Sequence, residues 1–398
     1  MDLIELEELI VLRNLLEDEV IRALMHDGTD KAIRMLVERA ELFGMRGNLI
    51  RCWLIRLLTQ QPNLVSATME RSRGKIGDSL KKLFINDLEK LMPLLNETSH
   101  KRMIIYNYKP TIERKIVNQS DLDALLSRAA TSKQVADALI EYYRRFGYGD
   151  IASYRAFKWS SGNLVGIEHF DDQNFDDLIG YDHQKKLLIE NTEAFLDGRG
   201  ANNVLLVGAR GTGKSSSIKA LVNRYYERSL RLIQLMKPQL SELPSLMENL
   251  RQYPSRKFII FLDDLSFEES EDEYKLLKSS IEGGVETRPS NVLICATSNR
   301  RHLIQETWRD RQDGQEELYK DDSVNETISL SDRFGLIIHY YAPNQDEYLA
   351  IIQHMLEKNG VALDAEQLRL EGVRWEMTHS GRNGRTAQQF VTSYLGRK

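Results

Sequence analysis

Hydrophobic positions divide the chain into zones of different periodicity. In the first zone, apolar side chains recur at helical spacing, as in the run formed by Leu9, Leu12, Leu16, Val20 and Leu24. The members of such a run fall near one face of a helix. We therefore predict an all-α N-terminal domain over residues 1–159, with further helices near 31–43, 48–58, 76–95 and 133–146.

A polar stretch closes this helical zone. Residues 160–174 are rich in Ser, Gly, Asn and Asp, a composition typical of a linker. Beyond it, short apolar runs that suit buried parallel strands alternate with helical stretches, which indicates a doubly wound α/β sheet. We predict an α/β domain over residues 175–343 and a C-terminal helical unit over 344–398, with strands at 204–207, 231–235, 258–262, 292–296 and 336–341.

Composition adds constraints on location and partners. The net charge of −5 gives the 398-residue chain no overall cationic field for nucleic acid or membranes. The acidic start of the chain does not fit a signal peptide, and no apolar stretch of about eighteen residues is present. We expect a cytoplasmic protein without membrane association, in which Cys52 and Cys295 are buried, reduced thiols.

The strongest motif lies between a predicted strand and a predicted helix, and it fits G-x-x-x-x-G-K-[ST]. Its glycines allow the main chain to approach phosphates closely, with amides directed at phosphate oxygens. Lys214 supplies a positive charge for the β and γ phosphates, and the Ser215 hydroxyl is an oxygen ligand for Mg²⁺. The predicted nucleotide-binding residues are Gly208, Ala209, Arg210, Gly211, Thr212, Gly213, Lys214, Ser215 and Ser216.

A second motif supplies carboxylates. The apolar run 258–262 ends in Asp263 and Asp264, and Asp263 lies 49 residues after Lys214. This arrangement resembles a Walker B strand, whose terminal Asp orders the Mg²⁺ shell. Asp263 is assigned that role, and Asp264 is assigned the activation of water. Glu268 is the alternative for the second role because its side chain is longer.

Further segments resemble the AAA+ superfamily in order along the chain. Residues 175–181, Phe-Asp-Asp-Leu-Ile-Gly-Tyr, resemble the segment that packs on adenine, which implies base contacts by Ile179 and Tyr181. The run 292–299 resembles the sensor 1 strand, which implies that Asn299 helps to hold the attacking water. The resemblance implies an AAA+ P-loop fold, a doubly wound parallel sheet with a C-terminal helical lid.

Two arginines complete the resemblance. Ser-Asp-Arg333-Phe-Gly resembles an arginine-finger box, in which the Arg reaches a neighbouring subunit's ATP. Gly-Arg385-Thr-Ala-Gln resembles sensor 2, in which a lid Arg contacts the γ-phosphate, and Arg382 is the rival for this role. The implied cofactors are ATP and Mg²⁺. The implied assembly is an oligomer, with an unknown macromolecular partner reached through residues 1–159.

Within the superfamily, residues 170–395 are more similar to an uncharacterised bacterial family of predicted AAA+ ATPases, catalogued as a domain of unknown function. The shared segments include 263–268, 296–302 and 330–335. AAA+ motors usually carry Glu where this chain has Asp264, so a slowly hydrolysing switch or scaffold is an alternative to a remodelling ATPase. A nucleic-acid remodeller is another alternative, because residues 31–82 carry eleven Lys and Arg against four acids.

Overall fold

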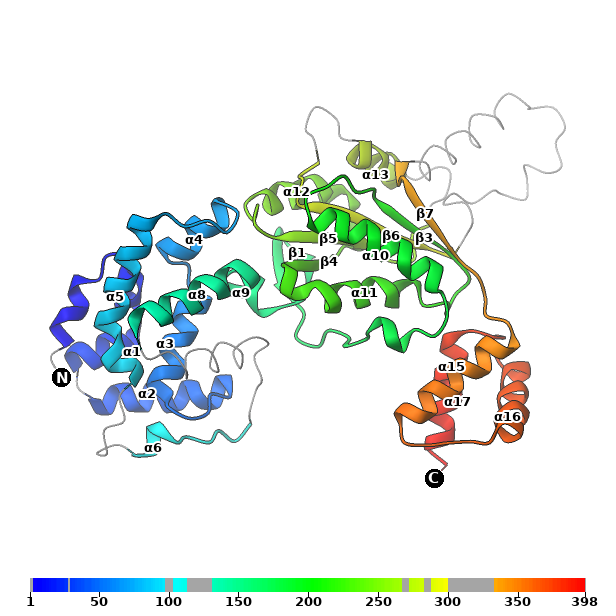
Figure 1. Ribbon diagram of the computed structural model, residues 1–398, viewed down its shortest axis with the longest axis horizontal. Coiled ribbons are helices and arrows are strands. Elements are labelled where there is room, and N and C mark those ends of the chain that lie inside the picture. The colour runs from blue at the N-terminus through cyan, green and yellow to red at the C-terminus, as the bar shows by residue number, and fades with distance from the viewer. Residues whose placement is uncertain are drawn as a thin grey trace. The chain divides into compact units, whose positions relative to one another are not determined.

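The computed structural model describes residues 3–27, 29–96, 103–112, 131–266, 272–282, 288–299 and 333–397. The chain forms two compact units, shown in Figure 1. The first unit contains Met1–Tyr154 together with two short later segments, Glu227–Ser229 and Gln252–Arg256. The second unit contains Arg155–Tyr226, Leu230–Arg251 and Lys257–Lys398.

The first unit is helical, as predicted. Its helices bury the apolar faces that the sequence shows, with Leu36, Leu54, Phe84 and Leu139 fully covered. None of the described helices is long and apolar enough to cross a membrane. The elements are η1 Leu3–Glu8, η2 Arg13–Glu17, α1 Glu19–Arg22, η3 Ala23–Asp27, α2 Thr29–Phe43, α3 Leu49–Gln60, α4 Leu64–Arg71, α5 Asp78–Asn96, α6 Met103–Tyr106, α8 Ser132–Phe146 and α9 Gly149–Ser153.

The first apolar run does not form one regular helix, contrary to the prediction from its spacing. The run begins after η1 and passes through η2, α1 and η3. The buried Asp87 carboxylate accepts hydrogen bonds from the amides of Ile10, Val11 and Leu12, at 3.0, 2.6 and 3.0 Å. Because these amides are bound to a side chain, they cannot donate to a preceding helical turn. Leu9, Leu12 and Val20 are buried, as the spacing predicts, but Leu16 and Leu24 are only partly buried because the backbone is not one regular helix.

The predicted linker at 160–174 is wrong for its first part, as is the helical assignment just before it. Strands β1 Ala156–Ser160 and β2 Asn163–Gly166 form an antiparallel hairpin, and β1 pairs with β4 Leu230–Gln234 in parallel. Ser161 and Gly162 both have positive φ, 51° and 77°, as a tight two-residue hairpin turn requires. The second unit therefore begins at Arg155, before the predicted boundary.

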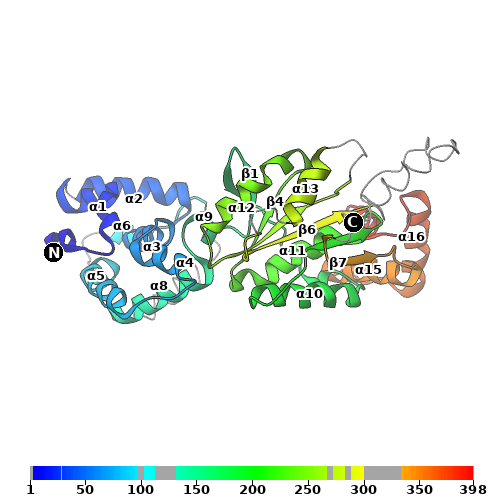
Figure 2. The ribbon, with the colours of Figure 1, turned by 90° about the horizontal axis from the view of Figure 1, so that it is seen from above.

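The second unit is built on a seven-stranded sheet in the order β2-β1-β4-β5-β6-β3-β7. All neighbouring pairs except β1 with β2 are parallel. Figure 2 shows α10 and α11 along one face and α12 and α13 along the other. This layering confirms a doubly wound α/β fold. The five strands predicted from apolar runs are all present. Strands β3, β5 and β6 are apolar at successive positions because both of their faces are covered, whereas the edge strand β7 keeps exposed positions.

The bounds of the five predicted strands differ from the observed ones by at most two residues. The remaining elements of this part are η5 Phe175–Asp177, α10 Asp182–Leu196, β3 Val204–Gly208, α11 Lys214–Tyr225, η6 Tyr226–Arg228, η7 Lys237–Glu242, α12 Leu243–Arg251, β5 Lys257–Leu262, α13 Asp272–Glu282, β6 Val292–Ser298 and β7 Leu336–Tyr340. Cys295 in β6 is buried, as is Cys52 in α3, and burial raises the pKa of the Cys295 thiol. Both cysteines are the buried thiols that the sequence predicts.

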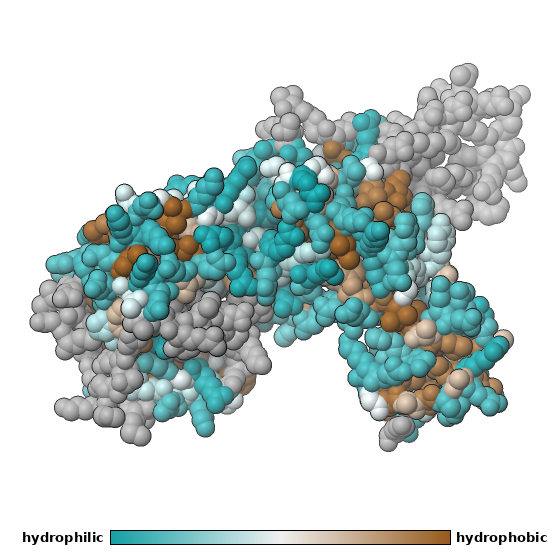
Figure 3. All heavy atoms as spheres, in the orientation of Figure 1, coloured by the Kyte–Doolittle hydropathy of each residue, from teal (hydrophilic) through white to brown (hydrophobic). Residues whose placement is uncertain are grey.

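Three helices form the C-terminal lid of the second unit: α15 Gln345–Lys358, α16 Ala365–Thr378 and α17 Gly384–Leu395. They enclose a small core of their own that includes Tyr348, Ile352, Phe390 and Val391. Figure 3 shows hydrophobic surface among the polar residues of the lid. On α16, Leu370 and Met377 are largely exposed, and their spacing of seven places them on one helix face.

Candidate nucleotide-binding site

The glycine loop between β3 and α11 has the backbone that its sequence predicts. Gly208, Gly211 and Gly213 have φ values of 153°, 75° and 86°, which residues other than Gly rarely adopt. A Cβ at Gly208 would lie 1.9 Å from the Tyr340 carbonyl oxygen, so only Gly fits between β3 and β7. Helix α11 begins at Lys214, and its first amides therefore face the loop, as an anion site requires.

Lys214 is only 6% exposed. Its ammonium donates hydrogen bonds to the carbonyl oxygens of Gly208 and Ala209, at 2.8 and 2.7 Å, and to Asn299 Oδ1 at 3.0 Å. Burial lowers the pKa of the ammonium, while Asp264 and Asp263 act in the opposite direction. The side chain is thus held folded against the loop by groups that can release it to a stronger acceptor.

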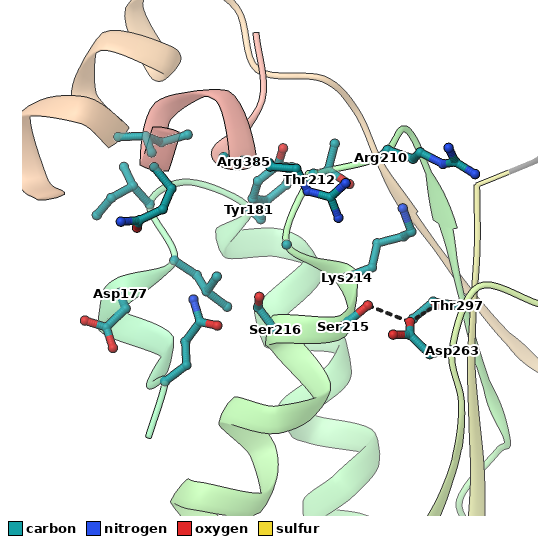
Figure 4. A pocket seen from close by; sticks show the side chains of 18 of the residues that line it. Asp177, Tyr181, Arg210, Thr212, Lys214, Ser215, Ser216, Asp263, Thr297 and Arg385 are labelled. Atoms are coloured by element: carbon teal, nitrogen blue, oxygen red, sulfur yellow. Dashed lines mark hydrogen bonds between the residues drawn. The ribbon is translucent and has the colours of Figure 1, made fainter. Parts of the chain in front are cut away.

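Oxygen ligands gather beside the loop. The Ser215 hydroxyl donates to Asp263 Oδ1 at 2.6 Å, and the Thr297 hydroxyl donates to the same oxygen, also at 2.6 Å. Figure 4 shows this group at the start of α11. Hydroxyl and carboxylate oxygens are the ligands that Mg²⁺ prefers. Ser215 and Asp263 therefore fit the metal role that the sequence assigns to them.

Asp264 is held in a strained backbone conformation, with φ at 53°. Its amide donates to Thr297 Oγ1 at 2.9 Å, and its carboxylate accepts a hydrogen bond from Asn299 Nδ2. Arg210 Nη2 lies 3.8 Å from the other carboxylate oxygen. The structure thus brings Asp264 and Asn299 together next to Lys214, where a γ-phosphate would meet the loop.

A cavity of about 630 Å³ extends from the loop toward the lid. Its lining includes apolar side chains from two elements, Ile179 and Tyr181 before α10 and Ile351 and Met355 from α15, beside the polar Asp177 and Gln388. The Tyr181 hydroxyl donates to the carbonyl oxygen of Tyr341 at 2.7 Å, which fixes its ring beside β7. An apolar recess next to a phosphate loop suits a nucleotide base.

The lid touches the glycine loop directly. The Gly384 amide donates to the Gly211 carbonyl oxygen at 2.8 Å, and Arg385 lines the cavity (Figure 4). Arg382, the rival for the lid arginine, instead donates to both carboxylate oxygens of Glu376, at 2.9 and 2.8 Å. Geometry therefore favours Arg385 as the lid residue that faces the loop.

Three predicted site residues are not among the described residues that line this cavity: Gly208, Ala209 and Arg333. A fourth lies outside the described residues. Arg333 is exposed just before β7 and is not among the described residues that line the cavity; a role in a neighbouring subunit's site does not require it to be. Glu268 lies outside the described residues, as do Ser331 and Asp332 of the arginine-finger box. The choice between Asp264 and Glu268 stays open at this point.

Thr297, whose hydroxyl contacts both aspartates, is not among the site residues predicted from the sequence. The strand register of the structure explains its place. Leu262 of β5 pairs with Ala296 of β6 in parallel, so Asp263 and Thr297, one residue further along, emerge side by side at the same sheet edge. Residues that follow neighbouring parallel strands meet at the carboxyl edge, where ligands bind in such sheets.

The profile of a family described as "Protein of unknown function (DUF815)" matches residues 152–398. No curated protein matches the chain. Among solved structures, the Thermotoga maritima RuvB Holliday junction branch migration motor is 18% identical, with a TM-score of 0.38, and the match covers 55% of this chain and 63% of that one. A proline-to-glycine mutant of Thermotoga maritima RuvB is 17% identical, with a TM-score of 0.39 and coverages of 55% and 64%. The match spans less than two thirds of either RuvB chain.

Proposed function

We propose that this chain, which belongs to the DUF815 family and has the AAA+ P-loop fold, is an ATPase that binds ATP with Mg²⁺ and hydrolyses it. The observation that carries the proposal is a convergence. Lys214, the pair Ser215 and Asp263, and the pair Asp264 and Asn299 meet at the carboxyl edge of the sheet, next to the start of α11. Each residue type suits one part of a phosphoryl transfer to water.

Binding is assigned to the loop and the recess beside it. The loop amides and Lys214 hold the phosphates, and the apolar recess around Tyr181 and Met355 takes the base. Ser215 and Asp263 would hold Mg²⁺, which supplies neutralisation of phosphate charge when bound. Lys214 exchanges its carbonyl partners for phosphate oxygens, which are stronger acceptors because they are charged.

Hydrolysis is assigned to Asp264 and Asn299. A water attacks the γ-phosphorus, the bond from that phosphorus to the bridging oxygen breaks, and ADP leaves with the bridging oxygen. Asp264 accepts the proton of the attacking water, and Asn299 orients that water. Arg385 is placed on the lid side of the same cavity, where a cation stabilises charge that develops on the phosphoryl oxygens.

Phosphate release measured at saturating ATP and Mg²⁺ tests this assignment. We expect turnover by the wild type and a loss of about 10²–10⁴-fold in Asp264→Asn, because general-base catalysis contributes about that factor. Nucleotide binding by Asp264→Asn is expected to persist. If Asp264→Asn hydrolyses ATP at the wild-type rate, Asp264 is not the base, and Glu268 takes its place as the candidate.

One observation favours a second function, a slowly hydrolysing nucleotide switch. The short Asp264 side chain is already engaged by Asn299 and lies near Arg210, which leaves it less able to reach a water. Near-zero turnover by a wild type that binds ATP tightly would support the switch. A contact between nucleic acid and the helical unit stays a prediction, as does a macromolecular partner for residues 1–159.

A further inference from the structure

Arg210 is a charged side chain at a position where the loop motif specifies none. It stands third in the loop and is 75% exposed, and it lines the same cavity as Lys214 and Asp264. Figure 4 shows it extending from the loop on the side of Lys214 and away from Arg385. The loop therefore presents two cations of its own to the space where the terminal phosphate of a nucleotide would lie.

The contact of Arg210 in this structure is weak and easily exchanged. Its Nη2 lies 3.8 Å from Asp264 Oδ2, and both side chains are more than half exposed, at 75% and 58%. Exposed ion pairs of this kind contribute little to stability. The backbone amide of Asp264 donates a hydrogen bond to Thr297, and its carboxylate accepts one from Asn299. Arg210 is therefore the side chain of this pair that moves more easily.

Charge balance gives this arginine a reason to move. A γ-phosphate beside the loop would lie close to Asp264. The negative charges of the phosphate and the carboxylate would then repel each other. Lys214 supplies a single positive charge, against the charge of the γ-phosphate and the carboxylates of Asp263 and Asp264 in the same cavity. A guanidinium also offers a planar fork of donors that matches phosphate oxygens.

We propose that Arg210 is the residue by which this site distinguishes ATP from ADP. Without ATP it pairs with Asp264, and with ATP it turns to the γ-phosphate, where it offsets the repulsion between that phosphate and the carboxylate. ADP ends at the β-phosphate and leaves Arg210 paired with Asp264. The inference rests on the proposed function and adds to it a source of nucleotide specificity within the chain.

Calorimetric titration of the full-length chain with Mg-ADP and with a nonhydrolysable ATP analogue tests the proposal. In Arg210→Ala, we expect affinity for the analogue to fall by about tenfold or more, the loss that goes with removal of a charge-assisted hydrogen bond. Affinity for ADP is expected to stay within about twofold of the wild-type value, because ADP has no phosphate at that place. Arg210→Lys is expected to fall between the two, since it keeps the charge without the fork.

Arg199→Ala is the matched control, because Arg199 is also exposed and also pairs with a neighbouring carboxylate, Asp197 at 2.8 Å, outside the cavity. It is expected to leave both affinities unchanged. Thermal unfolding without nucleotide should be the same for Arg210→Ala and the wild type. Equal losses for both nucleotides, or no loss for the analogue, would overturn the role of Arg210. A wild type that binds neither nucleotide would instead refute the proposed function.

Discussion

At the scale of single residues, Thr297 connects the two carboxylates of the site. Its hydroxyl donates to Asp263 and accepts the amide of Asp264, and it is almost fully buried. The second of these hydrogen bonds stabilises the left-handed backbone conformation of Asp264, which a residue with a Cβ adopts only at a cost in conformational energy. Thr297 is therefore a positioning residue for both the metal-side and the water-side carboxylate.

Thr297→Val removes the hydroxyl while keeping the shape of the side chain. We expect ATP hydrolysis to fall by roughly 10–100-fold, the range seen when groups that orient metal ligands are lost. We also expect the variant to need more Mg²⁺ for half-maximal rate, which a purely structural role would not produce. Thr297→Ser keeps the hydroxyl and should stay close to the wild type. If the valine and serine variants share one Mg²⁺ dependence, the bridge has no such role.

At the scale of elements, the start of α17 connects the lid to the loop. Asn383 caps the helix by accepting the Thr386 amide at 2.9 Å. A Cβ at Gly211 would lie 2.5 Å from Asn383 Oδ1, so the cap packs directly on the loop. The next residue, Gly384, donates to the Gly211 carbonyl oxygen. The N-terminus of α17 thus determines where Arg385 lies relative to the glycine loop.

Asn383→Ala should weaken this connection. Loss of the cap is expected to lower the free energy of unfolding by about 1 kcal/mol and to weaken ATP binding, because Arg385 is less firmly placed. Chemical denaturation and calorimetry measure the two effects. Asp364→Ala is the matched comparison, because Asp364 caps α16 by accepting the Gln367 amide at 2.8 Å and is not among the described residues that line the cavity. It is expected to cost about the same stability and to leave ATP affinity unchanged. Unchanged ATP affinity in Asn383→Ala would count against the connection.

The sequence predicts some elements well and others poorly, for physical reasons. Strands β3, β5 and β6 are apolar at nearly every position because both faces of the sheet are covered. Strand β1 has both buried and exposed positions and is followed by a polar turn. Its sequence therefore lacks the continuous apolar run by which the other strands are predicted. The glycine loop is local in sequence and is predictable for that reason. The bridge through Thr297 depends on strand register, which the sequence does not display.

At the scale of the whole molecule, the helical unit is not one continuous segment of chain. It includes Gln252–Arg256, and the buried Arg256 forms an ion pair with Glu70 of α4 at 3.3 Å. Arg256 also donates to the carbonyl oxygens of Tyr143 and Arg144, at 3.0 and 2.9 Å. A buried ion pair is stable only when such extra bonds satisfy it. Residues 1–154 alone would leave Glu70 buried without this partner.

Self-association is the other expectation at this scale. If Arg333 completes a neighbour's site, ATPase activity per subunit should fall on dilution to monomer, and Arg333→Ala should lose most of the activity that assembly adds. Arginine fingers supplied in trans contribute about 10³–10⁵-fold to turnover in related phosphoryl transfers. Turnover measured across a dilution series, with mass determined at each concentration, checks this. Activity that does not change with concentration would contradict the finger role.

The proposed function depends on the binding of a nucleoside triphosphate by the glycine loop and Lys214. Calorimetric titration of the full chain with Mg-ATP, compared with Lys214→Ala, tests it most directly. We expect saturable binding by the wild type and a loss of about tenfold or more in the variant, because a charge-assisted contact to phosphate is removed. An absence of binding by the wild type, or equal affinities for the two proteins, would contradict it.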